Sequence, residues 1–327
     1  MWNLDCRGTI VSAISDLRKL LQSYPEESSR IRRKRAAVSD LIDHLEQEAR
    51  RSYLTERLWT PFPSLDDSIG RFLPGRVYAF LGGPAVGKST LAIQFADHLL
   101  GVCEQRTALF SSHLRVDRLV RGLVVARSRC GMPGTGKRWV SESMVSAISN
   151  VAAQLADGRV EMLCEPQATF TDLEVLLEVF GDGPPPSVLI VDGLTSSMLG
   201  NDFGVKGVDR ALGRLRKIAE DRQVAVLVFL GWEEPGNREA WNPETGRHPN
   251  RLQIEDPSDL DADLVCGIWE KHCTEEWGQS DEVECVTRLT LLKNAFGLQV
   301  GIALEFDDDN LVFDEVEEAP TEEDNDE

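Results

Sequence analysis

The chain has 327 residues, of which 42% are hydrophobic, and it carries a formal net charge of −20. This length suits one large α/β core with appendages. No apolar run approaches the roughly 20 residues that cross a bilayer, and no secretory signal opens the chain, so we expect no membrane partner. The seven cysteines include no C-x-x-C pair. This pattern predicts reduced thiols in a cytoplasmic protein, with neither a zinc site nor a disulfide framework.

Two amphipathic helices are predicted in the N-terminal segment, residues 1–59. Apolar residues recur at helical spacing over residues 9–23, and Pro25 followed by two glutamates indicates a second helix that ends near Leu58. Because two such helices cannot bury their apolar stripes alone, we expect them to pack on each other, on the core or on another subunit. The basic cluster between Arg30 and Arg35 fits either a solvated helix face or a contact with nucleic acid or an acidic partner.

A phosphate-binding loop is predicted after a short apolar strand at residues 77–81. The predicted nucleotide-binding residues are, in order, Gly82, Gly83, Pro84, Ala85, Val86, Gly87, Lys88, Ser89 and Thr90. The first eight match G-x-x-x-x-G-K-[ST], in which glycines allow a turn that points successive N–H groups at an anion. The helix that begins at Lys88 adds the positive end of its dipole. Lys88 is predicted to contact the β- and γ-phosphates of ATP or GTP, and the Ser89 hydroxyl to ligate Mg²⁺.

From Leu65 to about Glu305, predicted strands and helices alternate. The predicted strands are 107–111, 160–164, 187–192, 224–230 and 264–269, and the predicted helices between them are 117–128, 142–155, 171–180 and 208–220. This order predicts an α/β fold with a mostly parallel sheet that helices cover on both faces, closed by a hairpin at 286–292 and 298–305. Asp192 ends a buried-strand signature and is predicted to anchor the water shell of Mg²⁺.

The chain ends in an acidic segment. Residues 305–327 carry thirteen acids and no base. We expect residues 60–313 to form the folded domain and residues 314–327 to be a disordered tail, because the tail is too polar to fold alone. The tail is interpreted as a solvated terminus, and the alternative is that it competes with nucleic acid or docks a basic partner. The acidic balance of the folded part argues against strong non-specific DNA binding.

Several motifs resemble RecA-fold P-loop ATPases, and among these the C-terminal motor domain of DnaB-type replicative helicases. The resemblance rests on Leu65-Asp66-x-x-Ile69-Gly70-Arg71-Phe72-Leu73-Pro74-Gly75 before the loop, and on Ala108–Ser111, Val191–Leu194, Asp261–Leu264 and Leu291–Asn294 after it. These motifs occur in the family's order over roughly residues 60–315. RadA-like and KaiC-like proteins share the fold and match less well.

The resemblance implies a homo-oligomeric ring, usually a hexamer, with ATP and Mg²⁺ at subunit interfaces and single-stranded DNA in the central channel. It places channel loops at residues 199–206 and 232–256. The DNA-binding candidates on these loops are Lys206, Arg238, Arg247 and Arg251, together with His248, and Trp232 and Trp241 are available to stack on bases. A mobile surface loop has the same composition, so both interpretations stay open.

Three positions depart from the family's catalytic pattern. The glutamate that activates the attacking water aligns with His113, and a polar residue that senses the γ-phosphate aligns with Gly231. The arginine expected two residues after Lys293 is Ala295. An arginine finger contributes about 10³–10⁵ in rate, so we expect slow hydrolysis. The catalytic candidates are Lys88, Asp192, His113 and Lys293, with Glu165 or Asp117 as replacements for the lost carboxylate and Arg288 for the lost finger.

Two functions follow from these assignments. The first is an ATP-driven DNA motor of the helicase type, acting in DNA replication or another DNA transaction. The second is a nucleotide-gated scaffold or KaiC-like regulatory assembly. Such an assembly would form rings or filaments and present the N-terminal helices and the acidic tail to an unknown protein partner. We favour an ATP-binding, DnaB-like protein that acts on or near DNA with impaired hydrolysis.

Overall fold

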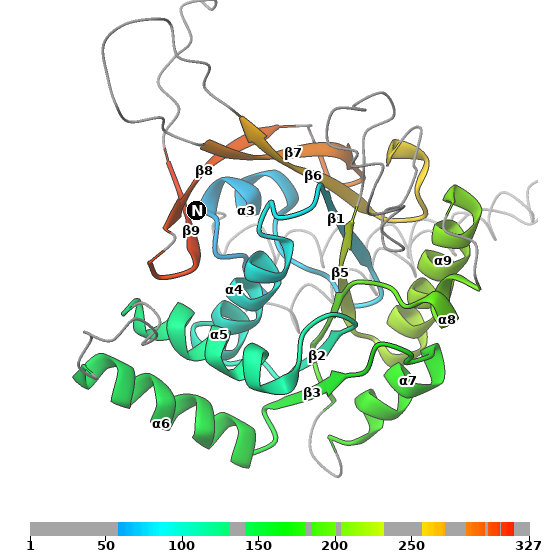
Figure 1. The fold of residues 1–327 in the computed structure, drawn as a ribbon. Helices are drawn as coiled ribbons and strands as arrows, with labels where there is room; N and C mark the ends of the chain where they lie inside the picture. Colours follow the sequence, from blue (N-terminus) through cyan, green and yellow to red (C-terminus); the bar gives the residue numbers. More distant parts are fainter. Residues whose placement is uncertain are drawn as a thin grey trace, which may run out of the picture. The chain divides into compact units, whose positions relative to one another are not determined.

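The computed structural model describes residues 58–130, 141–180, 185–200, 204–231, 257–271, 286–297, 300–307 and 309–316. The predicted N-terminal helices, the basic cluster at residues 30–35 and most of the acidic tail lie outside these ranges. The described part is an α/β domain built on one sheet (Figure 1). None of its helices is long and apolar enough to cross a membrane.

Within the described ranges the sheet has nine strands in the order β3-β2-β4-β5-β1-β6-β7-β8-β9. The strands are β1 Val77–Gly82, β2 Thr107–Ser111, β3 Val160–Cys164, β4 Val188–Asp192, β5 Ala225–Gly231, β6 Leu264–Lys271, β7 Val286–Asn294, β8 Gly301–Asp307 and β9 Val312–Glu315. Neighbouring strands from β3 to β6 run parallel, and β7, β8 and β9 add antiparallel pairs. The predicted mostly parallel sheet is therefore confirmed.

Helices cover both faces of this sheet. They are α3 Pro63–Ile69, α4 Lys88–Gly101, α5 Val116–Ser128, α6 Glu142–Ala156, α7 Phe170–Glu178, α8 Ser196–Leu199 and α9 Val205–Arg222. Alternate residues of β1 point to opposite faces, as a strand requires. Tyr78 and Phe80 pack with α3, α4, α5 and α6, whereas Val77, Ala79 and Leu81 pack with α7, α8 and α9. The two layers are visible on either side of the sheet in Figure 1.

The C-terminal end of the sheet differs from the sequence expectation. The predicted hairpin is the β7–β8 pair, but a further strand, β9, follows it and contains Asp314 and Glu315. The predicted start of the disordered tail at Asp314 is therefore placed too early. Asp314 pairs with Glu305 of β8, and its carboxylate forms a double ion pair with Arg129, with N–O distances of 2.7 and 2.8 Å. Glu315 accepts hydrogen bonds from the backbone N–H and the hydroxyl of Ser64 in α3.

The register of the parallel strands places the residues that end them side by side. Gly82 pairs with Gly231 of β5 and with Ile268 of β6. Ser111 at the end of β2 pairs with Asp192 at the end of β4. The loop after β1 and the side chains at the ends of β2 and β4 therefore meet at one edge of the sheet.

Candidate functional site

The predicted phosphate loop connects β1 to the first turn of α4. Gly87 is the residue before the helix and has a φ of 84°, a left-handed conformation that favours glycine. Gly82 is equally restricted, because a Cβ atom there would lie 2.7 Å from Cγ2 of Val86. Ala85 also has a positive φ, 64°, although it carries a Cβ atom. The loop therefore has the tight strand-to-helix turn that its sequence predicts.

The Lys88 side chain folds back over this loop. Its ammonium group donates a hydrogen bond to the carbonyl oxygen of Gly83. Burial lowers the pKa of Lys88, and the neighbouring Asp192 carboxylate opposes that shift. Lys88 and Asp192 thus share one partly desolvated space, in which a cation and an anion interact more strongly than they would in water.

Asp192 is the most enclosed acid of the site, with 3% of its surface exposed. One carboxylate oxygen accepts a hydrogen bond from the Ser89 hydroxyl, and the other accepts one from the Ser111 hydroxyl, both at 2.9 Å. Burial raises the pKa of Asp192, whereas the hydrogen bonds from Ser111 and Ser89 lower it. A hydroxyl and a carboxylate oxygen at this separation match the oxygen ligands that Mg²⁺ prefers. The residues present therefore fit the predicted metal ion.

His113 lies beside this acid. Its ring nitrogens are 3.2 and 3.3 Å from the Ser112 hydroxyl, and the ring is close enough to Asp192 to favour the ionised carboxylate. Gly193 has a φ of 85°, and a Cβ atom there would collide with Nε2 of His113. His113 therefore occupies the space over the backbone that follows Asp192, with its side chain exposed.

The two acids considered as replacements for the lost carboxylate interact with their own neighbours. Asp117 forms a 3.1 Å ion pair with Arg115, and both side chains are exposed. A carboxylate oxygen of Glu165 accepts the backbone N–H of Gln167 at 3.3 Å. Both contacts are made within the local segment of each acid, two residues away in the chain.

Gly231, expected to sense the γ-phosphate, lies at the opposite end of the sheet from Lys293 and Ala295, the positions expected to act in trans. Gly231 lies at the predicted site, because it pairs with Gly82, but it has no side chain to contribute. Lys293 pairs with Val265 near the start of β6, and its ammonium donates to the carbonyl oxygen of Leu260 at 2.8 Å. The backbone N–H of Ala295 donates to Asp263. The structure does not bring Lys293 to the phosphate loop of its own chain.

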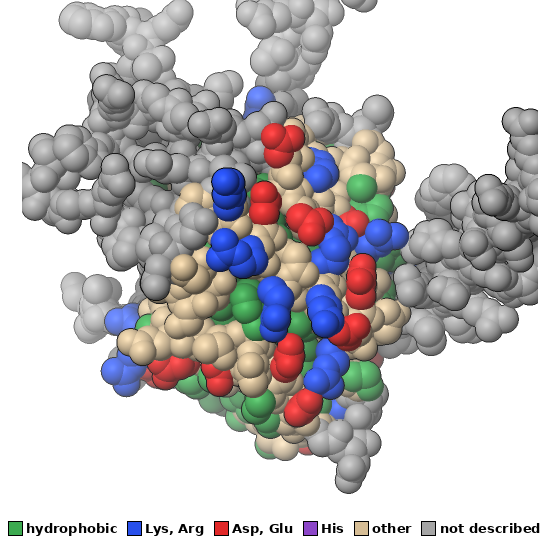
Figure 2. All heavy atoms as spheres, turned by 90° about the vertical axis from the view of Figure 1, so that its right-hand side faces the viewer, with side chains coloured by type: hydrophobic (Ala, Val, Ile, Leu, Met, Phe, Trp, Pro, Cys, Tyr) green, Lys and Arg blue, Asp and Glu red, His purple; other side chains and the backbone are tan. Residues whose placement is uncertain are grey.

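The predicted DNA contacts are only partly described. Lys206 is exposed in the first turn of α9, whereas Arg238, Arg247 and Arg251 lie outside the described residues. Figure 2 shows Lys and Arg side chains interspersed with acids on the face that carries α7 and α9. One such pair is Arg222 with Glu178, at 2.6 Å. Within the part of the surface that is described, this face is mixed in charge.

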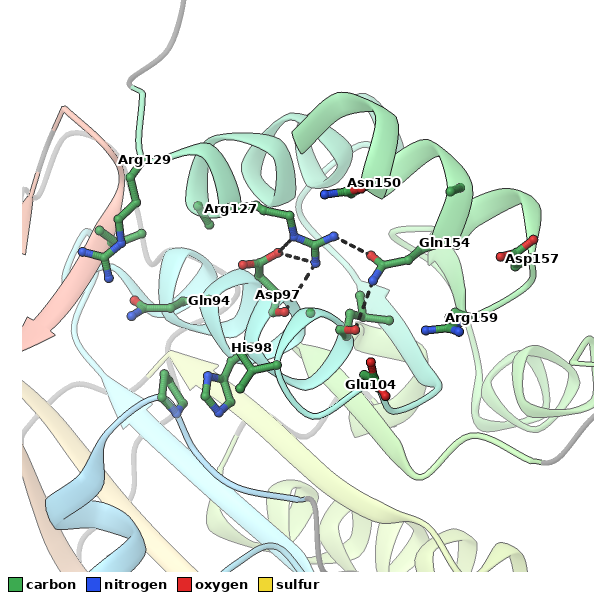
Figure 3. A pocket seen from close by; sticks show the side chains of 17 residues that line it. Gln94, Asp97, His98, Glu104, Arg127, Arg129, Asn150, Gln154, Asp157 and Arg159 are labelled. Carbon is green, nitrogen blue, oxygen red and sulfur yellow. Dashed lines mark hydrogen bonds and ion pairs between the residues drawn. The ribbon is translucent and has the colours of Figure 1, made fainter. Parts of the chain in front are cut away.

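A separate hollow of about 620 Å³ is lined mainly by the C-terminal parts of α4, α5 and α6. Figure 3 shows that Arg127 crosses it to bind Asp97 and Gln154, with N–O distances of 2.7 to 2.8 Å. Its lining includes no residue of the phosphate loop and neither Asp192 nor His113. No local sequence pattern predicts this hollow, because its walls come from segments that are far apart in the chain.

Comparisons with known proteins agree with this architecture. A replicative DNA helicase DnaB from Treponema pallidum (strain Nichols) is 22% identical over 273 residues, which are 82% of this chain and 58% of the helicase. The chain therefore spans little more than half the length of that relative. A solved DnaB-like replicative helicase, described with its interactions with primase, has a TM-score of 0.59 at 12% identity and covers 92% of this chain and 75% of its own.

A second solved structure, which is an isolated ATPase domain, has a TM-score of 0.58 at 13% identity and covers 86% of this chain and 98% of its own. At these identities the two structures establish the fold. The resemblance to RecA-fold, DnaB-like motor domains is thereby confirmed. The model of a protein family described as an AAA domain matches residues 45–230, more than half of the sequence. The chain therefore belongs to this AAA domain family.

Proposed function

We propose that this protein binds ATP with Mg²⁺ on the phosphate loop and acts in DNA transactions as a DnaB-like, nucleotide-dependent assembly with slow hydrolysis. The observation that carries the proposal is the convergence of Lys88, Ser89 and Asp192 at one edge of the sheet. Hydroxyl, ammonium and carboxylate groups are the three that a P-loop ATPase places around its metal ion and its β- and γ-phosphates.

Each residue has a defined part in this proposal. The backbone N–H groups of Gly83 and of residues 85–89, at the start of α4, would hold the phosphates, whereas Pro84 has no N–H to donate. Lys88 would exchange its bond to the Gly83 carbonyl for bonds to phosphate oxygens. Ser89 and Asp192 would hold Mg²⁺, whose chemistry is to neutralise charge on the β- and γ-phosphate oxygens.

Slow hydrolysis is proposed from the residues beside the loop. An imidazole such as that of His113 can act as a general base toward water, but it brings no fixed negative charge. The nearby alternatives Asp117 and Glu165 are engaged with Arg115 and Gln167. An imidazole therefore stands where the related ATPases have a carboxylate, and it is the group from which we expect the residual activity.

Assembly into a homo-oligomeric ring or filament is proposed from the position of Lys293. Because its ammonium lies away from its own phosphate loop, any contact of Lys293 with nucleotide would have to be made with that of another subunit. Lys206, Arg238, Arg247 and Arg251 are proposed DNA contacts, and the N-terminal helices and the acidic tail are proposed to meet a protein partner. The alternative of a KaiC-like scaffold without helicase activity is favoured by Gly231 and Ala295, which lack the expected side chains.

The decisive experiment measures ATP binding, sedimentation and ATPase activity on the full chain, with and without single-stranded DNA. Wild type should bind Mg-ATP and sediment as a larger species when it is present, with little turnover. Lys88→Ala should abolish both effects, whereas Lys217→Ala, an exposed lysine on α9, should abolish neither. Absence of binding heat at millimolar Mg-ATP would refute the proposal, and robust DNA-stimulated turnover would refute slow hydrolysis and the scaffold alternative.

A further inference from the structure

The C-terminal strand β9 touches the predicted phosphate loop. A Cβ atom at Gly87 would lie only 2.5 Å from Cζ and 3.0 Å from Cε2 of Phe313. The Phe313 ring, which is 2% exposed, therefore rests on the loop backbone immediately before Lys88. This is the point at which the loop makes its left-handed turn.

A second contact joins β9 to the helix that follows the loop. The Gln94 amide donates to the Phe313 carbonyl at 2.6 Å, and the Phe313 N–H donates to the Gln94 side-chain oxygen at 2.8 Å. In the described sheet β9 is an edge strand that pairs with β8. Gln94 thus satisfies two backbone groups that a further strand would otherwise bind. Gln94 is itself buried, two helical turns after Gly87.

The residues after Phe313 fasten the strand to two other elements. Asp314 pairs with Arg129, the residue that caps the C-terminus of α5, and Glu315 binds Ser64 in α3. Gln94 and Arg129 both lie on the side of the hollow that faces the C-terminal strands (Figure 3). The strand is consequently held at successive residues by α4, α5 and α3, and its one aromatic ring is directed at the loop.

We propose that Phe313 and Gln94 are positioning residues for the phosphate loop, so that the affinity for nucleotide depends on the docking of β9. The proposal rests on the proposed function, because it concerns the same loop. Glycines give the loop a wide choice of conformations, and the Phe313 ring occupies the space into which Gly87 would otherwise relax. If removing the ring lowers the fraction of correctly folded loop to about one tenth, the dissociation constant rises about tenfold.

The test compares full-length Phe313→Ala, Gln94→Ala and Phe313→Leu with wild type. Leu215→Ala is the matched control, because it removes a fully buried side chain from the opposite face of the sheet. Two quantities are measured: the dissociation constant of a fluorescent ATP analogue with Mg²⁺, and the hydrogen-exchange rate of the amides of residues 82–90 in ligand-free protein. Thermal unfolding reports the general loss of stability.

Phe313→Ala and Gln94→Ala should weaken binding about tenfold, in line with the loop fraction above, and should accelerate exchange in the loop. Phe313→Leu should show smaller changes in both binding and exchange. Leu215→Ala should lower stability without weakening binding or accelerating exchange in the loop. Unchanged loop exchange in Phe313→Ala, or an equal change in Leu215→Ala, would overturn the inference. If wild type binds no nucleotide, the proposed function fails, and the exchange rates in ligand-free protein still decide the role of Phe313.

Discussion

Replacing Asp192 with asparagine should separate the stability of the fold from its nucleotide chemistry. Burial raises the pKa of Asp192 above 3.8, so the ionised carboxylate opposes folding at neutral pH, by about 1.4 kcal/mol for each pH unit by which its pKa is raised. Asparagine removes that penalty. It keeps the shape and can bind both serine hydroxyls, but it loses about 1 kcal/mol per bond, because bonds to a charged group are stronger. The two effects oppose each other, so the free energy of unfolding should change by less than about 2 kcal/mol.

Two measurements test this prediction. Urea unfolding of ligand-free protein at pH 5 and pH 8 gives the free energy of unfolding. Calorimetric titration of ATP in Mg²⁺ or in EDTA gives the affinity for ATP and its dependence on the metal ion. In wild type, the Asp192 contribution should weaken stability as pH rises from about 4 through the raised pKa. Asp192→Asn should reduce the fall in stability between the two pH values, and the part that remains should include the contribution of Asp66. The variant should also lose the gain in ATP affinity that Mg²⁺ provides. Ser111→Ala is the control, since it removes one hydrogen bond to Asp192 and leaves Ser89 in place. A loss of more than about 3 kcal/mol in Asp192→Asn, or intact Mg²⁺ dependence, would refute this reasoning.

Three further predictions concern His113, Gly193 and Asp66. His113→Glu should raise ATP turnover by about 10² or more, the usual contribution of a positioned base, and an equal rise in His113→Gln would argue against a role for the carboxylate. Gly193→Ala should destabilise the protein by roughly 1–2 kcal/mol through its positive φ and displace His113, which the imidazole NMR signals would report. Burial raises the pKa of Asp66 from 3.8 to about 7. Its contribution to stability should therefore fall as pH rises across that interval, and Asp66→Asn should make the urea midpoint less dependent on pH there.

Much of the fold can be predicted because its central parallel strands are mostly apolar. The predicted strands at 107–111 and 160–164 coincide with β2 and β3, and the helix predicted from Glu142 is α6, whose N-cap Ser141 accepts the Met144 N–H. The short helices α3 and α8 are not predicted. Neither is long enough to show a period of 3.6 residues, and α3 begins at Pro63, which follows an apparent helix stop.

The site can be predicted in part, for a related reason. The loop motif and the acid that ends β4 are local signals, and the parallel register brings them together. The sequence does not reveal Ser111 as the second partner of Asp192, because a serine that ends a strand has no distinctive pattern. Nor does it reveal Phe313, because the contact with Gly87 joins residues 226 positions apart, and no local periodicity reports such a contact.

The backbone conformation of Ala85 affects how far the loop is ordered before it binds its ligand. A residue with a Cβ atom at a φ of 64° is disfavoured by roughly 1–2 kcal/mol. The rest of the fold must therefore hold the loop in a shape that Ala85 resists, and much of the ordering entropy is lost during folding rather than at encounter with the anion. Ala85→Gly would remove that strain, but the loop would then be less ordered before the anion binds.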